Sequence, residues 1–259
     1  MNVLELKNLS TAPWGPTLLE DISLELDTGE ILGIIGPNGA GKTSLLQTLS
    51  GDYAAINGCV KFLGKDIASW HGLSRAQSMA VLPQLSLLNF PYTVEEVILL
   101  GRTPHSSGAN ADQEILNEVM RATDTERLQH RIYTQLSGGE KQRVQLARVF
   151  SQVWPDTRNE PRLLLLDEPT AALDLAHQQL MMNTLRKLAQ RNCAIVIVAH
   201  DFNLIAGLAD KISALKQGCQ IAYGSASEVL TKEMFAQVFE VDVTISAHPD
   251  TARPLVISL

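Results

Sequence analysis

The sequence has few cysteines, and nothing in their arrangement marks a disulfide framework or a metal site. Three occur in 259 residues, at Cys59, Cys193 and Cys219, and none belongs to a CxxC pair. An odd, widely scattered set fits reduced thiols and excludes a zinc site or a disulfide-stapled fold. We therefore expect free thiols in a reducing, cytosolic environment.

Long apolar runs are also missing. The longest are LLLL at Leu163–Leu166 and CAIVIVA at Cys193–Ala199, far short of the roughly 18–20 residues that cross a bilayer. The start, MNVLELKNLS, lacks the basic and apolar stretches of a signal peptide. These absences predict a cytoplasmic chain whose membrane role, if it has one, is peripheral.

The chain has no run of lysine or arginine, and its net charge is −7 with a pI of about 5.4. Nonspecific nucleic-acid binding needs a basic face, so we expect no nucleic acid as a partner. Apolar residues make up 45% of the sequence, which suffices for a packed core. The length suits one large α/β domain, with or without an inserted lobe.

Apolar strands and helices alternate in the pattern of a parallel α/β sheet. Ile31–Ile35 is predicted to be a buried strand that runs into a glycine-rich loop. Further strands are predicted at Arg162–Leu166 and Ala194–Ala199, with a helix at Leu175–Gln190 between them. This alternation predicts a mostly parallel sheet.

A helical block occupies residues 85–155, approximately, between the two strand-rich parts. Thr93 and Glu96 have capping-box spacing, and further helices are predicted at Asp112–Ala122 and from Gly138 to about Val153. The block is predicted to be a helical subdomain inserted in one domain that spans 1–259. The tail, 225–259, holds one predicted helix and a short extended end, too little for a separate domain.

The motif GPNGAGKT at Gly36–Thr43 matches G-x-x-x-x-G-K-[ST] at every required position. Its glycines let backbone N–H groups surround a β-phosphate, and the helix that follows adds its positive N-terminus. Lys42 can neutralise phosphate charge and the Thr43 hydroxyl can ligate Mg²⁺. The nucleotide-binding residues predicted here are Gly36, Pro37, Asn38, Gly39, Ala40, Gly41, Lys42, Thr43 and Ser44. The motif predicts nucleotide binding but does not separate kinases, GTPases and ATPases.

Two carboxylates follow the strand predicted at Arg162–Leu166, at the sheet edge where ligands collect. Asp167 can hold Mg²⁺ through water, and Glu168 can polarise an attacking water. His200 closes the next strand, where it can contact a γ-phosphate or hold Glu168 and the water in line. On the residues alone, a solvated acidic turn and a satisfied polar histidine remain the alternatives.

A second glycine-rich helix start lies in QLSGGEKQRVQLAR, at Gln135–Arg148. Ser137 and Glu140 have capping-box spacing, with Gly138 and Gly139 in the first turn. Such a start offers N–H groups to an anion. Two such sites suit one nucleotide in a two-fold dimer, where each subunit presents this helix to the nucleotide of the other. The residues alone also permit closure within one chain.

Six segments together resemble, in family order, the nucleotide-binding subunits of ABC transporters over almost the whole chain. They are GPNGAGKT (Walker A), Gln84 in AVLPQ (Q-loop), LSGGEKQ (signature), LLLLDE (Walker B), AALD (D-loop) and His200 (switch histidine). The resemblance implies an α/β fold, with a P-loop NTPase core of mostly parallel sheet, an antiparallel β-subdomain and an inserted helical subdomain. It also selects the dimer over closure within one chain.

The resemblance implies ATP hydrolysis, with ATP and Mg²⁺ as cofactors. Glu168 would be the general base and His200 a γ-phosphate contact, while Thr43, Gln84 and Asp167 would surround Mg²⁺. The signature residues facing the ATP of the partner subunit would be Ser137, Gly138, Gly139 and Glu140. Gln84 and Asp174 would take part in coupling the ATP site to the membrane partner and in contacts between the two subunits of the dimer.

Adenine in this family usually stacks on an aromatic residue just after the first strand. The expected position falls on Pro13, and Trp14 lies beside it. We therefore predict Trp14 as the stacking residue, against the alternative of an exposed tryptophan with no partner.

Three stretches resemble importers of metal chelates, and among these the heme (hemin) importer ATPases: Ala80–His105, Val153–Gln179 and Ser246–Val256. In the second stretch many relatives have serine in place of Ala171. The likeness implies heme as the cargo, with an iron siderophore or cobalamin as the alternative. Because such a subunit contacts the transporter and not the cargo, His105, His177 and His248 are expected at the surface or an interface, and not as heme ligands.

The partners implied are a second copy of the chain, two copies of a transmembrane permease and, indirectly, a periplasmic or surface binding protein. The implied place is the cytoplasmic face of the cell (inner) membrane. An ABC-type ATPase that acts on ribosomes or DNA is the alternative of another class. Members of that class carry two cassettes or a long coiled-coil insert, and this chain has neither.

Overall fold

The computed structural model describes residues 1–84, 88–154 and 160–258. It divides into two compact units, the first made of Met1–Trp70 with Ala194–Leu259 and the second of His71–Cys193. Parts of two stretches that carry the family likeness, residues 85–87 and 155–159, lie outside the described residues. The boundaries predicted from the sequence, one domain with a helical insert, stay a prediction.

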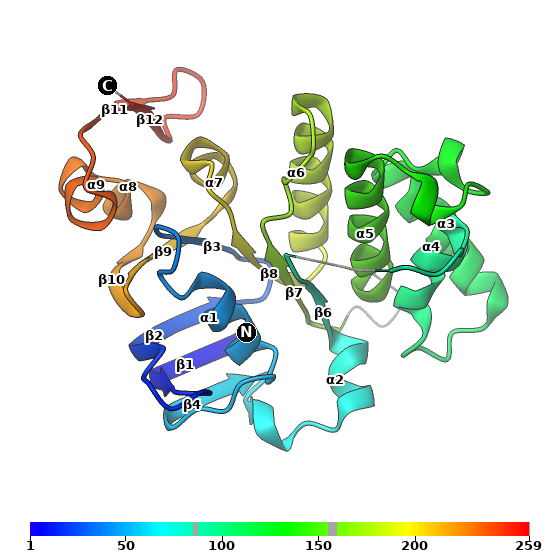
Figure 1. The fold of residues 1–259 in the computed structure, drawn as a ribbon, viewed down its shortest axis with the longest axis horizontal. Helices are drawn as coiled ribbons and strands as arrows, with labels where there is room; N and C mark the ends of the chain where they lie inside the picture. The colour runs from blue at the N-terminus through cyan, green and yellow to red at the C-terminus, as the bar shows by residue number, and fades with distance from the viewer. Residues whose placement is uncertain (85–87, 155–159, 259) are drawn as a thin grey trace. The chain divides into compact units, whose positions relative to one another are not determined.

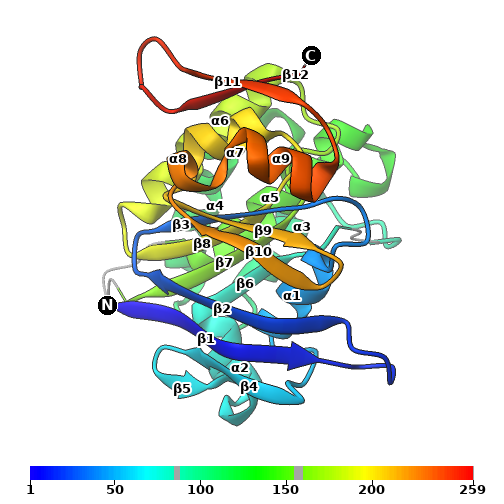
Figure 2. The ribbon, with the colours of Figure 1, turned by 90° about the vertical axis from the view of Figure 1, so that its left-hand side faces the viewer.

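The first unit consists of strands that alternate with short helices (Figures 1 and 2). Its strands are β1 (Asn2–Thr11), β2 (Leu19–Asp27), β3 (Ile31–Ile35), β4 (Asn57–Phe62), β5 (Lys65–Asp66), β8 (Cys193–Val198), β9 (Lys211–Lys216), β10 (Cys219–Gly224), β11 (Val243–Ala247) and β12 (Pro254–Ser258). Its helices are α1 (Lys42–Leu49), the 3-10 turn η1 (Ile67–Ser69), α7 (Phe202–Leu208), α8 (Ala226–Val229) and α9 (Lys232–Phe239).

Two kinds of strand pairing occur in the first unit. β1 pairs antiparallel with β2 and with β4, whereas β3 pairs parallel with β8 and with β9. The order within this unit is β5-β4-β1-β2-β10-β9-β3-β8. β3 and β8 are buried along their whole length, which explains their unbroken apolar sequences. The predicted combination of parallel core and antiparallel β-part is confirmed.

Helices cover both faces of the parallel strands in the first unit. α7, α8 and α9 lie on one side of β3, β9 and β10, and α1 lies on the other (Figures 1 and 2). Gly33 permits the approach of α7, because a Cβ at this position would come within 2.6 Å of the Ile205 side chain. Three aromatic rings, of Phe202, Phe235 and Phe239, fix α7 against α9 at centroid distances of 4.8 to 5.5 Å.

The second unit is mainly helical. Its elements are α2 (Gly72–Ser78), β6 (Met79–Leu82), α3 (Val94–Leu99), η2 (Leu100–Arg102), α4 (Ala109–Ala122), η3 (Glu126–Leu128), η4 (Tyr133–Gln135), α5 (Gly138–Val153), β7 (Arg162–Asp167) and α6 (Leu175–Ala189). β6 and β7 pair in parallel, and α5 packs against α3 and α4 (Figure 1). Across the described residues of both units, no helix has the length and apolar character needed to cross a membrane.

The three thiols differ in accessibility, which gives a test of the packing around β8, where Cys193 lies. Burial raises the pKa of the Cys193 thiol from 9.0 to about 12, so its thiolate is about a thousand-fold scarcer at neutral pH. Cys59 and Cys219 are half-buried. We expect iodoacetamide to label these two in the native chain and to label Cys193 only after unfolding, as measured by mass spectrometry of peptides. Rapid labelling of Cys193 in the native chain would contradict this packing.

Candidate phosphate site and acidic edge

The phosphate loop connects the end of β3 to the start of α1, and the nine residues 36–44 predicted to bind the phosphates lie in this loop and the first turn of α1. Gly41 is the N-cap of α1 and has a φ of 100°, a backbone conformation that L side chains rarely adopt. At Gly36 a Cβ would lie 2.4 Å from the carbonyl oxygen of Leu215, so the chain can pass this point only as glycine. The loop is therefore a bare backbone cradle.

Lys42 lies over this cradle. Its ammonium donates hydrogen bonds to the carbonyl oxygens of Gly36 and Pro37, at 2.8 and 2.9 Å, and its side chain is buried. No side chain caps the first turn of α1, and that turn contains no acidic residue. Helix-start N–H groups and a fixed ammonium thus converge on the loop, which suits a polyphosphate.

His200 lies at the same edge of the sheet as the phosphate loop, as the sequence predicts. β3 and β8 pair in parallel with Ile34 opposite Val198, so both strands end on one side. His200 follows β8 by two residues and is exposed. Asp201, the next residue, caps α7 by accepting hydrogen bonds from the N–H groups of Asn203 and Leu204. The imidazole is therefore carried on the turn that joins β8 to α7.

Trp14 has an aromatic partner that the sequence did not reveal. Its ring meets the ring of Tyr53 edge to face, with centroids 5.3 Å apart and planes at 79°. The side chain is nevertheless 70% exposed, so ring surface remains open to a ligand. Trp14 is thus not the partnerless tryptophan of the alternative interpretation, and its stacking on adenine stays a prediction.

In the second unit, β6 and β7 bring Gln84 and Asp167 to one sheet edge. Leu82 lies opposite Leu166 in the parallel pair, so both polar residues follow the carboxyl ends of neighbouring strands. Asp167 is the last residue of β7 and is 3% exposed. Carboxylate and amide oxygens are donors that Mg²⁺ accepts, so the donor types at this edge fit that ion.

Glu168, next to Asp167, has an unusual backbone. Its φ is 50°, in the left-handed region that a residue with a Cβ seldom occupies. Conformations of this kind cost of order 1–3 kcal/mol and concentrate at functional sites, where the surroundings hold them in place. The side chain is half-buried. The backbone of the turn is thus constrained at Glu168, whose side chain is partly shielded from solvent.

The signature segment starts α5 with the predicted capping box. The Ser137 hydroxyl accepts from the N–H of Glu140, and the Glu140 carboxylate accepts from the Ser137 N–H at 2.8 Å. These bonds, with the Arg131 guanidinium at 3.0 Å, hold the pKa of Glu140 below its ordinary value. The first-turn N–H groups of such a helix have no acceptor within the helix. The same geometry occurs at Thr93 and Glu96, as predicted.

The loop after β7 lies against the first turn of α5. The Gln142 amide donates to the carbonyl oxygen of Pro169 at 2.9 Å, and a Cβ at Gly139 would lie 2.8 Å from the carbonyl oxygen of Ala172. Ala172 itself has a φ of 63°. The segments LSGGE and DEPTAALD, almost thirty residues apart along the chain, are thus neighbours in the second unit.

A sequence model described as ABC transporter matches residues 19–171, which is more than half of the chain. The chain belongs to the ABC transporter family. The family predicted from the order of the motifs is therefore confirmed.

Several proteins with high overall similarity to this ABC family member are named hemin import ATP-binding protein HmuV. The one from Pseudomonas fluorescens is 44% identical, with 99% of this chain and 100% of that protein aligned. The one from Gloeobacter violaceus is 47% identical, over 95% of this chain and 90% of its own length. The one from Pseudomonas aeruginosa is 43% identical over 99% of this chain and 100% of its own.

Solved structures have the same fold. One, described as a metal-chelate type ABC transporter in an inward-facing conformation, superposes with a TM-score of 0.81 at 26% identity, covering 100% of this chain and 97% of its own. The ATP-binding subunit of an ABC transporter superposes with a TM-score of 0.79 at 23% identity, over 88% of this chain and 91% of that one. The predicted fold class is confirmed.

One polar network near the ABC motifs was not predicted from the sequence. Asp174 caps α6, and its carboxylate lies 2.7 Å from Nδ1 of His177, whose Nε2 lies 3.3 Å from the Asp124 carboxylate. Asp124 also accepts from Arg143 of α5 at 2.9 Å. The His177 N–H and imidazole hold the pKa of Asp174 below its ordinary value. Through Asp124 and Arg143, His177 therefore links the D-loop to the signature helix; its expected place at the surface or an interface stays a prediction.

The other two histidines, which we expect not to bind heme, are half-buried and lie apart from the motifs along the chain. Nε2 of His105 lies 2.9 Å from the Gln152 carbonyl oxygen, and Nδ1 of His248 accepts from the N–H of Asp250.

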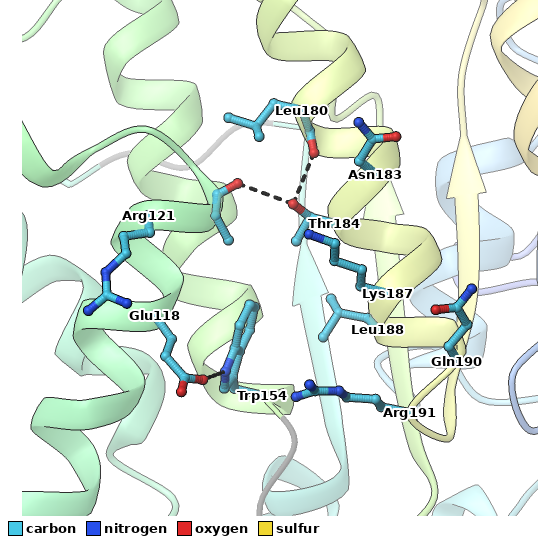
Figure 3. A pocket seen from close by; sticks show the side chains of 11 residues that line it. Glu118, Arg121, Trp154, Leu180, Asn183, Thr184, Lys187, Leu188, Gln190 and Arg191 are labelled. Carbon is cyan, nitrogen blue, oxygen red and sulfur yellow. Dashed lines mark hydrogen bonds between the residues drawn. The ribbon is translucent and has the colours of Figure 1, made fainter.

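A cavity of about 640 Å³ in the second unit contains none of the predicted site residues. It lies among α4, α6 and the end of α5 (Figure 3). The Trp154 indole donates to the Glu118 carboxylate at 2.6 Å, and the Thr184 hydroxyl donates to the carbonyl oxygens of Leu180 and Ala122. The polar groups named here are therefore already paired within the protein.

Proposed function

We propose that this ABC family member is the ATPase subunit of an importer that couples ATP hydrolysis to heme (hemin) uptake through a membrane permease. The observation that carries the proposal is the 41–47% identity, over nearly the whole chain, to proteins named for hemin import. Likeness of this extent covers the motifs and also the stretches around them.

ATP binding rests on the cradle at Gly36–Thr43. The loop offers backbone N–H groups and the start of α1 to the phosphates, and Lys42 supplies a positive charge. Thr43, Gln84 and Asp167 have oxygen donors of the types that Mg²⁺ takes, which supports them as its ligands. When bound, that ion would neutralise charge on the phosphates. Trp14 stacks on adenine in this proposal.

Hydrolysis is assigned to Glu168 and His200. Glu168 accepts a proton from the attacking water, because its carboxylate follows the Mg²⁺-binding Asp167 on a constrained turn. His200 holds the γ-phosphate by hydrogen bonding. These roles follow from the family pattern, to which the two residues correspond position by position.

The pair of glycine-rich helix starts supports a homodimer. Ser137, Gly138, Gly139 and Glu140 contact the ATP bound to the partner subunit in this proposal, and Asp174 lies at the dimer interface. ATP then joins the two copies, and its hydrolysis separates them.

Two copies of a permease are the proposed membrane partner, at the cytoplasmic face of the cell membrane. Four large apolar side chains within residues 73–100 are exposed, and two of them, Phe90 and Tyr92, lie with ring centroids 6.0 Å apart, which supports docking there; the four are Leu73, Phe90, Tyr92 and Leu100. Gln84 transmits the state of the ATP site to this surface. A periplasmic or surface binding protein acts indirectly through the permease.

A ferric siderophore or cobalamin is the second candidate cargo. The observation in its favour is the full-length superposition on a metal-chelate type transporter at 26% identity. The mechanism would be unchanged, since the ATPase subunit does not contact the cargo in this proposal.

The cargo is tested by reconstituting the chain with its permease in lipid and measuring ATP turnover. We expect heme-loaded binding protein to stimulate turnover several-fold, and the Lys42→Ala variant to show none, because it loses the phosphate-binding ammonium. Stimulation by a siderophore-loaded binding protein, with none by the heme-loaded one, would replace heme by a siderophore as the cargo.

A further inference from the structure

The C-terminal tail has a defined structure whose purpose the motifs do not explain. β11 and β12 form an antiparallel hairpin with Val243 opposite Ser258 and Ala247 opposite Pro254. Its turn is closed by the His248 N–H, which donates to the Arg253 carbonyl oxygen, and by the Ala252 N–H, which donates to that of His248. The stretch Ser246–Val256 carries family likeness but no assigned chemistry.

Asn203, near the start of α7, forms two hydrogen bonds with the backbone of this hairpin, in the way that a neighbouring strand would. Its amide nitrogen donates to the Val256 carbonyl oxygen at 3.1 Å, and its amide oxygen accepts from the Val256 N–H at 2.8 Å. Both backbone groups of Val256 are therefore satisfied by one side chain from α7. These two hydrogen bonds fix the orientation of the hairpin relative to α7 as well as its distance from α7.

Arg253 bonds the other end of α7. Its guanidinium donates to the carbonyl oxygens of Ala206 and Ala209, at 3.1 and 3.3 Å. These carbonyls belong to the last turn and the C-cap, where a helix lacks internal donors and a cation is favourable. The hairpin thus holds α7 at its first and its last turn.

α7 needs such support, because it has seven residues and helices this short do not persist without tertiary contacts. Its apolar face is fixed by Ile205 against Gly33, but its exposed side is bonded by the hairpin. His200 precedes the N-cap Asp201 directly. A displacement of the first turn of α7 is therefore transmitted to the His200 backbone within two residues.

We propose that the C-terminal hairpin positions His200 by fixing α7, with Asn203 and Arg253 as positioning residues. The inference rests on the proposed function, in which His200 holds the γ-phosphate. Reacting groups tolerate misplacement poorly, and about 1 Å costs up to roughly a hundred-fold in rate. Because Phe202 and Ile205 also hold α7, loss of the Asn203 bonds gives a smaller shift, so we expect a moderate loss of kcat with ATP binding unchanged.

The test is a double-mutant cycle on the full chain, with ATP turnover measured for Asn203→Ala, His200→Ala and the two together. We expect Asn203→Ala to lower kcat roughly three- to ten-fold with KM for ATP within about two-fold of the unmodified chain. In the His200→Ala background the same substitution changes nothing further. Thr251→Ala, an exposed position in the turn of the same hairpin, is the matched control and keeps normal kcat.

A second variant leaves α7 unaltered. Val256→Pro removes the N–H that Asn203 accepts from, on the outer edge of β12, and should lower kcat to the same extent. The affinity for nucleotide and the unfolding temperature of each variant separate misplacement from misfolding.

Effects of Asn203→Ala and His200→Ala that multiply would overturn the inference, as would unaltered kcat in both Asn203→Ala and Val256→Pro. Absence of Lys42-dependent ATP hydrolysis in the unmodified chain would instead remove the proposed function. The two failures are therefore distinguishable.

Discussion

Replacing Glu168 by glutamine is expected to reduce ATP turnover about 10²- to 10⁴-fold, the share that a positioned general base contributes. Glutamine has nearly the same shape, so the turn with its φ of 50° is retained, but the amide cannot accept a proton from water. Nucleotide binding persists because Gly36–Thr43 is untouched. The ATP-bound dimer should therefore accumulate, detectable by light scattering with ATP and Mg²⁺.

The matched control is Glu118→Gln, also in the second unit. Glu118 accepts from the Trp154 indole and lies outside every motif, so turnover should stay normal. If the Glu168→Gln variant hydrolyses ATP at the unmodified rate, Glu168 is not the base.

The largest effect on stability is expected for Arg102→Ala. The Arg102 side chain is 5% exposed and donates to the Asp112 carboxylate at 2.9 Å, the Ser151 carbonyl oxygen at 2.7 Å and the Ser107 hydroxyl at 2.9 Å. Its removal leaves the buried Ser151 carbonyl oxygen without this donor, whereas the Asp112 carboxylate keeps a hydrogen bond from the Ser107 hydroxyl at 2.7 Å. Leaving buried acceptors without a donor in this way costs about 1–3 kcal/mol of the free energy of unfolding. Urea denaturation followed by circular dichroism measures the loss.

Arg121→Ala is the matched comparison. Arg121 forms an ion pair with Glu126 at 3.4 Å, but its side chain is 65% exposed. Exposed pairs contribute about 0–1 kcal/mol, because water solvates both charges when the pair opens. Equal losses for Arg102→Ala and Arg121→Ala would show that burial does not set the contribution of the Arg102 network.

Local chemistry explains the elements that the sequence predicted well. Ser137 with Glu140, and Thr93 with Glu96, fix two helix starts to the residue, because a capping box needs only four consecutive residues. The helix predicted from Asp112 begins earlier, at Ala109, where Gly108 precedes it with no side-chain cap. Without a capping side chain, the sequence contains no signal for the start.

Contacts between distant residues account for what the sequence did not predict. The tail was expected to end in a short extended segment, whereas it forms the hairpin of β11 and β12. Neither the bond of Asn203 to Val256 nor the link from Asp174 through His177 to Asp124 has a local pattern. Such contacts depend on how distant elements pack against each other, and no short stretch of sequence predicts that packing. The positive φ of Glu168 could not be predicted from the sequence either, because glycine is the residue that usually indicates this conformation.

The contact between Gly139 and Ala172 has a consequence for how sequences of this kind can diverge. A Cβ at 139 would lie 2.8 Å from a backbone oxygen, which cannot be relieved by changing a side chain. Any larger residue at 139 would therefore require the loop that follows Asp167 to take another path. A substitution at Gly139 therefore requires a compensating change in the loop that contains Ala172. We expect the signature segment and the D-loop to vary together among related sequences.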